Sequence, residues 1–515
     1  MRDAARVFQS AWWGADAEKR REFMAFSRKA LALTTAASFS LALTGCMGGG
    51  SIPSASTPIT QQEAQQGAQY HPQLLAEFGG ALTGPQAQYV EQVTKNVAVQ
   101  SGLGNARDSF TVSLLNSSVN NAFAVPGGYV YTTRQLVTLM NNEAELAGVM
   151  GHEVAHVAAR HSQRRQRTAQ QNSLLGGLGA ILSGVLLGNS EIGNTLSRGI
   201  LQTSQLLTLK FSRSQELQAD DLGIQYLTSA GYDPRAMGTV LSSLAAQNAL
   251  DAQLQGRGDA RPPAWASTHP DPASRVRTAL AKAEGLPGTV TNRNTFLNRI
   301  DGLVYGDDPE QGIIEGSTFI HPVLRLAFTA PQGFYMMNGT RAVTINGQSG
   351  RAQMTLAPYN GNLETYVRQQ FKTLGGEQQQ LAPQTLERTN INGIKAAYGV
   401  ARVNNGTSQV DVVIYAYEFA NDRAYHFQTI APAGRADVFT SMFRSMRRIS
   451  SSEAANVVPR RIDVVTVQRG DSVASLAQRM AFDDAKEARF RVLNGLGSND
   501  QLQAGQQVKI VIKSR

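Results

Sequence analysis

Cysteine is almost absent from this sequence of 515 residues, because Cys46 is the only one. No disulfide can therefore form within the chain, and each folded unit must be stabilised by burial of its own core. At roughly 150 residues per domain, the length predicts three or four such units. Small secreted proteins that depend on several disulfides are excluded.

Hydrophobic runs long enough to cross a membrane are missing as well. The uncharged stretches at 30–45 and 168–190 are both too short in their apolar parts to cross a bilayer as a helix. We interpret 168–190 as a helical hairpin or a lid over a cleft, with a membrane-dipping segment as the alternative. The net charge is +9, but no Lys/Arg run is interleaved with aromatic residues. We therefore predict no nucleic-acid partner.

The N-terminal residues have the organisation of a secretion signal. Arg28 and Lys29 precede a short apolar region that ends in Leu-Thr-Gly-Cys46. This ending resembles the lipobox of bacterial lipoproteins, in which the cysteine thiol carries a diacylglyceryl group. The resemblance implies a signal peptide at 1–45, with Met24 as a possible true start, and a lipidated Cys46 on the periplasmic face of the outer membrane. The alternative is a buried free cysteine.

Composition divides the rest of the chain into a tether and three folded units. Residues 46–70 are rich in Ser, Thr and Gln and predict a flexible tether. We predict a multidomain fold: a mainly α unit with a small β-sheet at 71–288, an α+β unit at 300–450 and a small unit at 462–513. Helices are expected at 87–100, 134–165, 212–230, 234–249, 272–284, 363–374 and 436–446. Strands are expected at 110–115, 122–131 (interrupted by Pro-Gly-Gly), 324–329, 342–345, 352–356, 396–403, 410–419 and 424–430.

The sequence His152-Glu153-Val-Ala-His156 is an HExxH pattern on a predicted helix. Residues i and i+4 share one helix face, so both imidazoles can bind one zinc ion, while Glu153 can act as a base on water. Gly151 leaves room beside the first histidine. The alternative is a surface helix that carries two incidental histidines.

A catalytic zinc site needs a third protein ligand and an open fourth position. His161 is the nearest candidate, but on a continuous helix it lies about 140° from His156 around the axis. We therefore expect an acidic ligand from another helix, and Glu216 supplies it. Asp220 lies on the same face one turn later and is placed to hold a ligand histidine. The alternative is an ordinary solvated acidic face.

Four motifs in this order resemble the HtpX/BepA/Ste-type gluzincin metallopeptidases, and most closely their BepA-like and Oma-like branch. The resemblance covers about residues 70–285. The motifs are Asn121-Ala-Phe-Ala-Val-Pro-Gly-Gly-Tyr129, Asn142-Glu-Ala-Glu-Leu-Ala-Gly-Val-Met-Gly-His-Glu-Val-Ala-His156, Phe211-Ser-Arg-Ser-Gln-Glu-Leu-Gln-Ala-Asp220 and Thr268-His-Pro270.

The resemblance implies one Zn2+ per chain, held by His152, His156 and Glu216, with the HExxH glutamate as general base. His269 and Arg213 are candidate donors to the oxyanion of the reaction. In BepA-like proteins the histidine of the His-Pro loop is implicated in controlling access to the metal. His269 is therefore also a candidate for zinc's open position in a closed state, and a third interpretation gives it no role.

The last unit resembles LysM. The resemblance depends on Val465 to Ala477, on Val-Leu-Asn-Gly-Leu496 and on Leu502 to Ile510. It implies a strand, two helices and a strand, with binding to peptidoglycan as the usual role. The segment 480–491 departs from the commonest pattern, so a structural or protein-docking module is the alternative.

Together these features predict a zinc endopeptidase of the bacterial envelope that cleaves misfolded or stalled envelope proteins. The strand at 122–131 can offer an edge to an extended substrate, unless it is paired on both sides. One alternative is a chaperone or assembly scaffold of the outer membrane with occasional proteolysis. Another is a structural lipoprotein that binds peptidoglycan.

Overall fold

The computed structural model describes residues 57–103, 106–165, 211–254, 269, 272–375, 381–404 and 408–515. Cys46, the predicted signal peptide and the 168–190 segment lie outside these residues. Among the helices that are described, none is long and apolar enough to cross a membrane.

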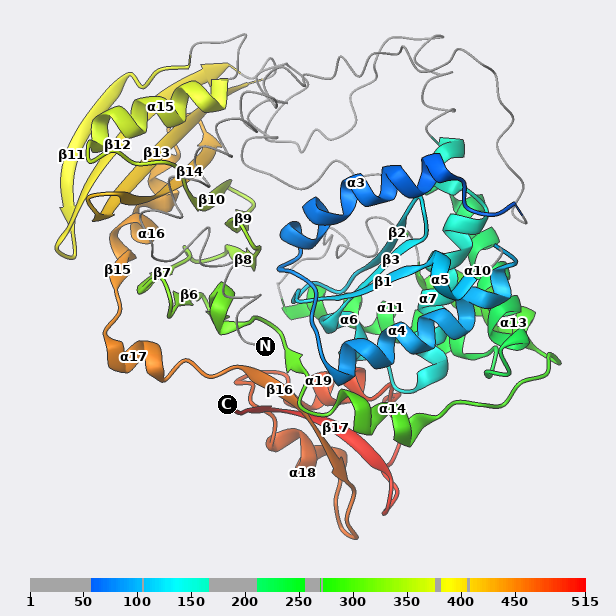
Figure 1. The fold of residues 1–515 in the computed structure, drawn as a ribbon. Coiled ribbons are helices and arrows are strands. Elements are labelled where there is room, and N and C mark those ends of the chain that lie inside the picture. Colours follow the sequence, from blue (N-terminus) through cyan, green and yellow to red (C-terminus); the bar gives the residue numbers. More distant parts are fainter. Residues whose placement is uncertain are drawn as a thin grey trace. The chain divides into compact units, whose positions relative to one another are not determined.

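A three-stranded sheet lies in the first folded unit, in the order β1-β3-β2 (Figure 1). β1 (Thr111–Leu115) runs parallel to β3 (Tyr129–Thr133), and β3 runs antiparallel to β2 (Ala122–Val125). The single interrupted strand predicted from the sequence is therefore a hairpin. Gly127 and Gly128 make its turn with φ of 89° and 80°, values that favour glycine. This arrangement leaves β2 at one edge of the sheet.

The two faces of this sheet pack against different helices, because successive strand residues point to opposite sides. One face packs on α3 (Gln61–Glu77), and the other joins the core that includes α4 (Pro85–Ala98) and α7 (Glu143–Ala158). In Figure 1, α3 and α4 accordingly lie on opposite sides of the sheet. The first face contributes Leu115, Phe123 and Tyr131. The second contributes Leu114, Ala122 and Val130.

The predicted tether differs from the structure in its last ten residues, because α3 begins at Gln61. Thr60 Oγ1 accepts a hydrogen bond from the Glu63 amide at 3.2 Å, and Glu63 Oε2 accepts from the Thr60 amide at 2.8 Å. This capping box starts the helix despite a composition that favours disorder. Glu63 Oε1 also accepts from Arg160 Nε at 2.9 Å, in an ion pair that is buried on both sides.

The pattern predicted as one helix over 134–165 is broken in two places. A short α6 (Arg134–Leu139) precedes α7, and Asn142 caps α7 by accepting from the Glu145 amide at 2.9 Å. α7 ends at Ala158, and Arg160 takes a left-handed φ of 51°. The chain therefore changes direction just after the HExxH segment.

The other helices of this unit are α5 (Ala106–Ser109), α10 (Arg213–Ser229), α11 (Ala236–Leu254), α13 (Pro272–Ala283) and α14 (Arg293–Ile300).

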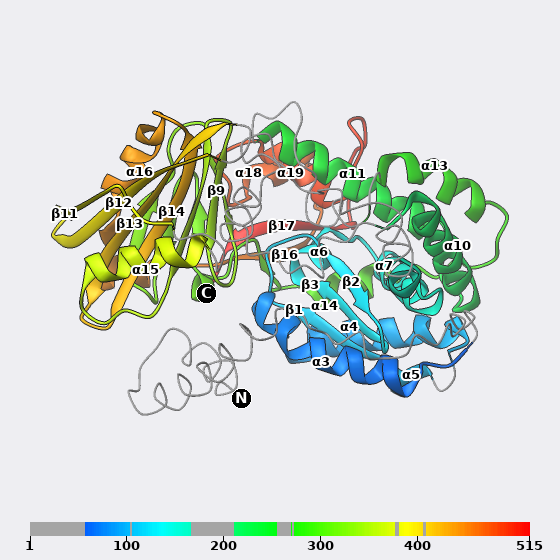
Figure 2. The same cartoon turned by 90° about the horizontal axis from the view of Figure 1, so that it is seen from above.

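The unit predicted at 300–450, here called the accessory region, is mainly β. One long helix, α15 (Leu363–Gly375), lies along one face of its larger sheet (Figure 2). That sheet is antiparallel, in the order β11-β12-β13-β14-β10-β9-β8. Its strands are β8 (Tyr335–Asn338), β9 (Val343–Gly347), β10 (Gly350–Leu356), β11 (Thr385–Ile391), β12 (Ile394–Asn404), β13 (Gln409–Ala420) and β14 (Arg423–Pro432). A smaller sheet contains β5 (Ile313–Glu315), β6 (Thr318–His321), β7 (Leu326–Thr329) and β15 (Arg447–Arg448).

The C-terminal unit has the predicted order of strand, two helices and strand. Its elements are β16 (Arg460–Thr466), α18 (Val473–Gln478), α19 (Lys486–Leu493) and β17 (Gln507–Lys513). They enclose a core of their own that includes Leu476, Phe490 and Ile510. The multidomain fold class predicted from the sequence is thus confirmed, with strands dominating the accessory region.

We predict that Glu63→Gln lowers the free energy of unfolding of the first folded unit by about 3 kcal/mol, because the buried Arg160 guanidinium then loses the carboxylate charge that it contacts at 2.9 Å. Glutamine preserves the capping box, so the change isolates the ion pair. Urea unfolding of the full chain measures it. The control is Glu91→Gln, which removes the carboxylate from the more exposed ion pair between Glu91 and Lys95. It should lower the free energy of unfolding by less than about 1 kcal/mol. Equal losses in the two variants would contradict the prediction.

Candidate metal centre

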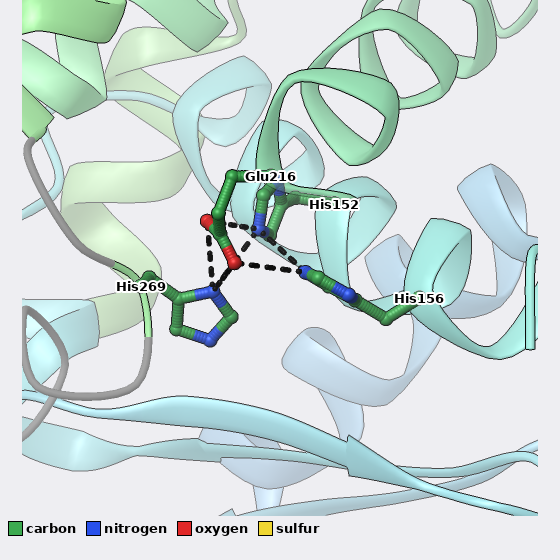
Figure 3. A group of neighbouring side chains, drawn as sticks. All are labelled: His152, His156, Glu216 and His269. Atoms are coloured by element: carbon green, nitrogen blue, oxygen red, sulfur yellow. Dashed lines mark hydrogen bonds and ion pairs between the residues drawn. The ribbon is translucent and has the colours of Figure 1, made fainter. Parts of the chain in front are cut away.

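Four buried side chains converge on one point between α7 and α10 (Figure 3). They are His152 and His156 from α7, Glu216 from α10, and His269 from the segment before α13. One ligand atom from each lies within 4.8 Å of all the others. Each of these residues is at most 3% exposed, so water competes little for their ligand atoms.

Close packing of α7 and α10 makes this convergence possible. A Cβ added to Gly151 would lie 3.7 Å from the Gly223 Cα, and one added to Gly223 would lie 2.6 Å from the Met237 Cε. A side chain at Gly223 would therefore force Met237 to move. The helix period places His152 and His156 on one face, with their Nε2 atoms 3.0 Å apart.

Glu216 brings a carboxylate to the two histidines. Its Oε2 lies 3.6 Å from His152 Nε2, and its Oε1 lies 3.6 Å from His156 Nε2. Arg275 Nη1 donates to Glu216 Oε2 at 2.7 Å and fixes the carboxylate. Burial opposes ionisation of Glu216, but the charges and hydrogen bonds of His269 and His152 outweigh it and hold its pKa far below the ordinary value.

Asp220 stands behind the first histidine, as its spacing from Glu216 predicts. Its Oδ1 lies 3.0 Å from His152 Nδ1, on the side of the ring that faces away from the cluster. Burial lowers the pKa of His152, but the contacts with Asp220 and Glu216 outweigh this effect and raise it to about 9. The carboxylates of Asp220 and Glu216 therefore place negative charge beside both nitrogens of the His152 ring.

His269 lies between the donor cluster and the glutamate of the HExxH pattern. Its Nδ1 is 3.0 Å from Glu216 Oε1 and 3.3 Å from His152 Nε2. Its Nε2 is 3.5 Å from Glu153 Oε1. The ring thus occupies the space through which a molecule would reach Glu153 from the cluster.

The Glu153 carboxylate is buried, and neither oxygen has a hydrogen-bond partner among the described residues. Burial raises its pKa, since a charged carboxylate is disfavoured away from water. A buried carboxylate without partners is costly unless it has a task. Its position fits a base that takes a proton from a molecule at the cluster.

The donor set fits a metal ion. Asp220 engages Nδ1 of His152, so the lone pair of the neutral ring lies on Nε2 and points at the other donors. The Nε2 atoms of His152 and His156 lie 3.0 Å apart, and two nitrogen lone pairs at that distance repel unless a proton or a cation lies between them. The Glu216 carboxylate lies 3.6 Å from both nitrogens and supplies the negative charge that attracts a cation. Imidazole and carboxylate donors in a group of four suit zinc.

The arginine that the structure brings to the site is not the one that the sequence suggested. Arg213, predicted as an oxyanion donor, is exposed at the first residue of α10 and is not brought to the cluster, because this turn lies at the surface. Arg275, which the sequence analysis did not identify, is 2% exposed and donates to both Glu216 and Asp220. Its position on α13, one to two turns after His269, was the available signal.

Comparisons with known proteins agree with this geometry. Residues 85–283 match the family described as "Peptidase family M48", and residues 465–511 match "LysM domain". A "Beta-barrel assembly-enhancing protease" of Escherichia coli O157:H7 is 33% identical over 245 residues, which are 47% of this chain and 48% of that protein. A "Mitochondrial metalloendopeptidase OMA1" of Schizosaccharomyces pombe is 29% identical over 226 residues, 43% of this chain and 60% of that protein. The chain thus spans about half the length of the bacterial relative.

A solved structure from Bacteroides thetaiotaomicron covers 39% of this chain and 87% of its own, at 9% identity and a TM-score of 0.23. A likeness at this level supports no inference about fold or function.

We predict that the purified chain binds one zinc ion, and that His152→Ala reduces the bound zinc to background because it removes a central donor. Elemental analysis after dialysis against a weak chelator measures the stoichiometry. Glu153→Gln, which changes a neighbouring carboxylate outside the donor set, should retain one zinc per chain. Zinc that persists in His152→Ala would show that the metal binds elsewhere.

Proposed function

Because residues 85–283 match the family described as "Peptidase family M48", we propose that this chain is a zinc-dependent endopeptidase of the bacterial cell envelope. One observation carries the proposal: a buried carboxylate without hydrogen-bond partners, Glu153, lies beside four converging metal-donor side chains. A purely structural metal site has no use for such a base.

The roles of the residues follow from their positions. His152, His156 and Glu216 would hold zinc, which when bound polarises the scissile carbonyl and makes water more acidic. Glu153 takes the proton of the attacking water and later passes it to the leaving amine. Asp220 and Arg275 keep the ligands in place, since they contact His152 and Glu216 directly.

His269 acts as a gate in this proposal. With His269 in the cluster, four protein groups surround the metal position, whereas a catalytic site leaves the fourth place open. The ring also lies between the cluster and Glu153. We therefore take the arrangement as a closed state, and substrate access requires His269 to move away.

The substrate we propose is an extended segment of an unfolded or misassembled envelope protein. β2 lies at an edge of its sheet, and its residues Ala124 and Val125 line a small pocket together with His156 and Val157. An extended peptide paired with β2 would run beside the metal position and be read mainly through its backbone. Low side-chain specificity suits a quality-control protease.

The location rests on features of the sequence outside the described residues. A lipidated Cys46 followed by 46–60 as a tether would hold the peptidase at the periplasmic face of the outer membrane. The LysM domain, with its own core, would bind peptidoglycan as a second contact. A protein that works mainly as an assembly scaffold, with gated proteolysis, is the second candidate, and a closed metal site favours it.

We predict that Glu153→Gln reduces cleavage of an unfolded protein such as casein by at least about 100-fold, because the proton transfer is lost. Cleavage is measured on gels at equal zinc content. Glu364→Gln, an exposed change on α15, is the control and should leave the rate unchanged. A Glu153→Gln chain that still cleaves at the original rate would defeat the peptidase proposal. Loss of cleavage with full rescue of envelope defects in cells would favour the scaffold.

We predict that His269→Ala raises the rate of casein cleavage or self-cleavage, about tenfold for each 1.4 kcal/mol by which the closed arrangement is favoured. The double variant with Glu153→Gln should lose this gain, which assigns the activity to this site. An unchanged or lower rate in His269→Ala, with zinc content intact, would refute the gate.

A further inference from the structure

A fourth histidine, His161, lies directly behind the second ligand histidine, His156. Its Nδ1 is 2.9 Å from His156 Nδ1, and the two rings meet edge to face with centroids 4.9 Å apart. His156 Nε2 points the other way, toward His152 and the donor cluster. His161 is fully buried but does not belong to the group of converging ligand atoms.

The break after α7 brings His161 to this place. On a continuous helix the residue would face away from the metal, as the sequence analysis expected. Instead α7 ends at Ala158, and the left-handed Arg160 turns the following residues back toward His156. Arg160 is held by Glu63, and Gln215 donates to the His161 carbonyl at 3.2 Å. The turn is therefore fixed from two sides.

The hydrogen bonds of His161 define which nitrogen of His156 carries the proton. Gln218 Oε1 lies 3.0 Å from His161 Nε2, and a carbonyl oxygen can only accept, so His161 Nε2 donates. A neutral imidazole has one N–H, so His161 Nδ1 accepts from His156 Nδ1. The lone pair of His156 is then on Nε2, which faces the cluster.

We propose that His161 is a positioning residue for the metal centre, which orients His156 and fixes its metal-binding tautomer through the Nδ1–Nδ1 hydrogen bond. It does for His156 what Asp220 does for His152, with a neutral acceptor in place of a carboxylate. Removing a residue that hydrogen-bonds to a metal ligand in this way lowers metal affinity by about 10- to 100-fold. The proposal rests on the metal site of the proposed function but not on proteolysis.

The test measures the zinc dissociation constant of the full chain by competition with a chromogenic chelator. His161→Phe keeps a ring but has no acceptor, and it should weaken zinc binding by about 10- to 100-fold. His161→Asn places its Oδ1 near the position of the histidine Nδ1 and should bind close to the unchanged chain. His321→Phe replaces a buried histidine in the accessory region and should leave the affinity unchanged.

A role in packing alone predicts a different result. Urea unfolding of the metal-free chain would then show a loss of stability in His161→Phe. Zinc affinity would not depend on whether the residue at 161 carries a hydrogen-bond acceptor, as asparagine does and phenylalanine does not. The visible spectrum of the Co2+ form gives a second reading, because loss of the orienting bond should change the ligand field in His161→Phe and not in His161→Asn. Should His161→Phe fail to fold, His161→Leu takes its place.

Equal zinc affinity in the unchanged chain and in His161→Phe or His161→Leu would overturn the proposal. So would a loss in His161→Asn as large as in His161→Phe. Neither outcome depends on peptidase activity, so failure of the proposed function in the Glu153→Gln test remains a separate result.

Discussion

The structure of the peptidase region depends on one constraint, the burial of four metal-donor side chains whose lone pairs point at a common centre. The Nε2 atoms of His152 and His156 lie 3.0 Å apart, and their lone pairs repel unless a proton or a cation lies between them. A cation bound among these atoms replaces the repulsion by attraction, because each lone pair then coordinates the metal. Two features support this centre. Glycines let α7 and α10 approach closely, and each ligand has a partner behind it that holds it in place.

Each ligand at the centre has a partner that holds it from behind. Asp220 holds His152, His161 holds His156, and Arg275 holds Glu216. Two of these six residues, Glu216 and Asp220, come from α10, as does Gln218. That helix therefore supplies both a ligand and part of the supporting layer, and a shift of α10 would disturb metal and support together.

The part of this site that follows from the sequence is the part set by helical periodicity. The spacing of His152 and His156, and of Glu216 and Asp220, places each pair on one face of a helix whatever surrounds it. Spacing could not reveal the His156–His161 contact, because that contact depends on the break at Arg160, whose left-handed conformation no pattern indicated.

Long-range contacts account for the other differences. Arg275 reaches Glu216 across 59 residues, and Glu63 reaches Arg160 across 97. The Gln-rich composition around Glu63 predicted a tether, whereas this ion pair and the capping box order a helix. The sequence predicts β2 and β3 as one interrupted strand, because only the three turn residues Pro126, Gly127 and Gly128 separate them, and the left-handed φ of the two glycines reverses the chain.

X-ray absorption at the zinc edge of the purified chain tests the central claim most directly. The account predicts a zinc shell of nitrogen and oxygen atoms at about 2.0 Å, with imidazole scattering that weakens by one ring in His269→Ala and by one ring in His156→Ala. A shell of oxygen atoms alone, or imidazole scattering that neither substitution changes, would show that zinc does not occupy this centre.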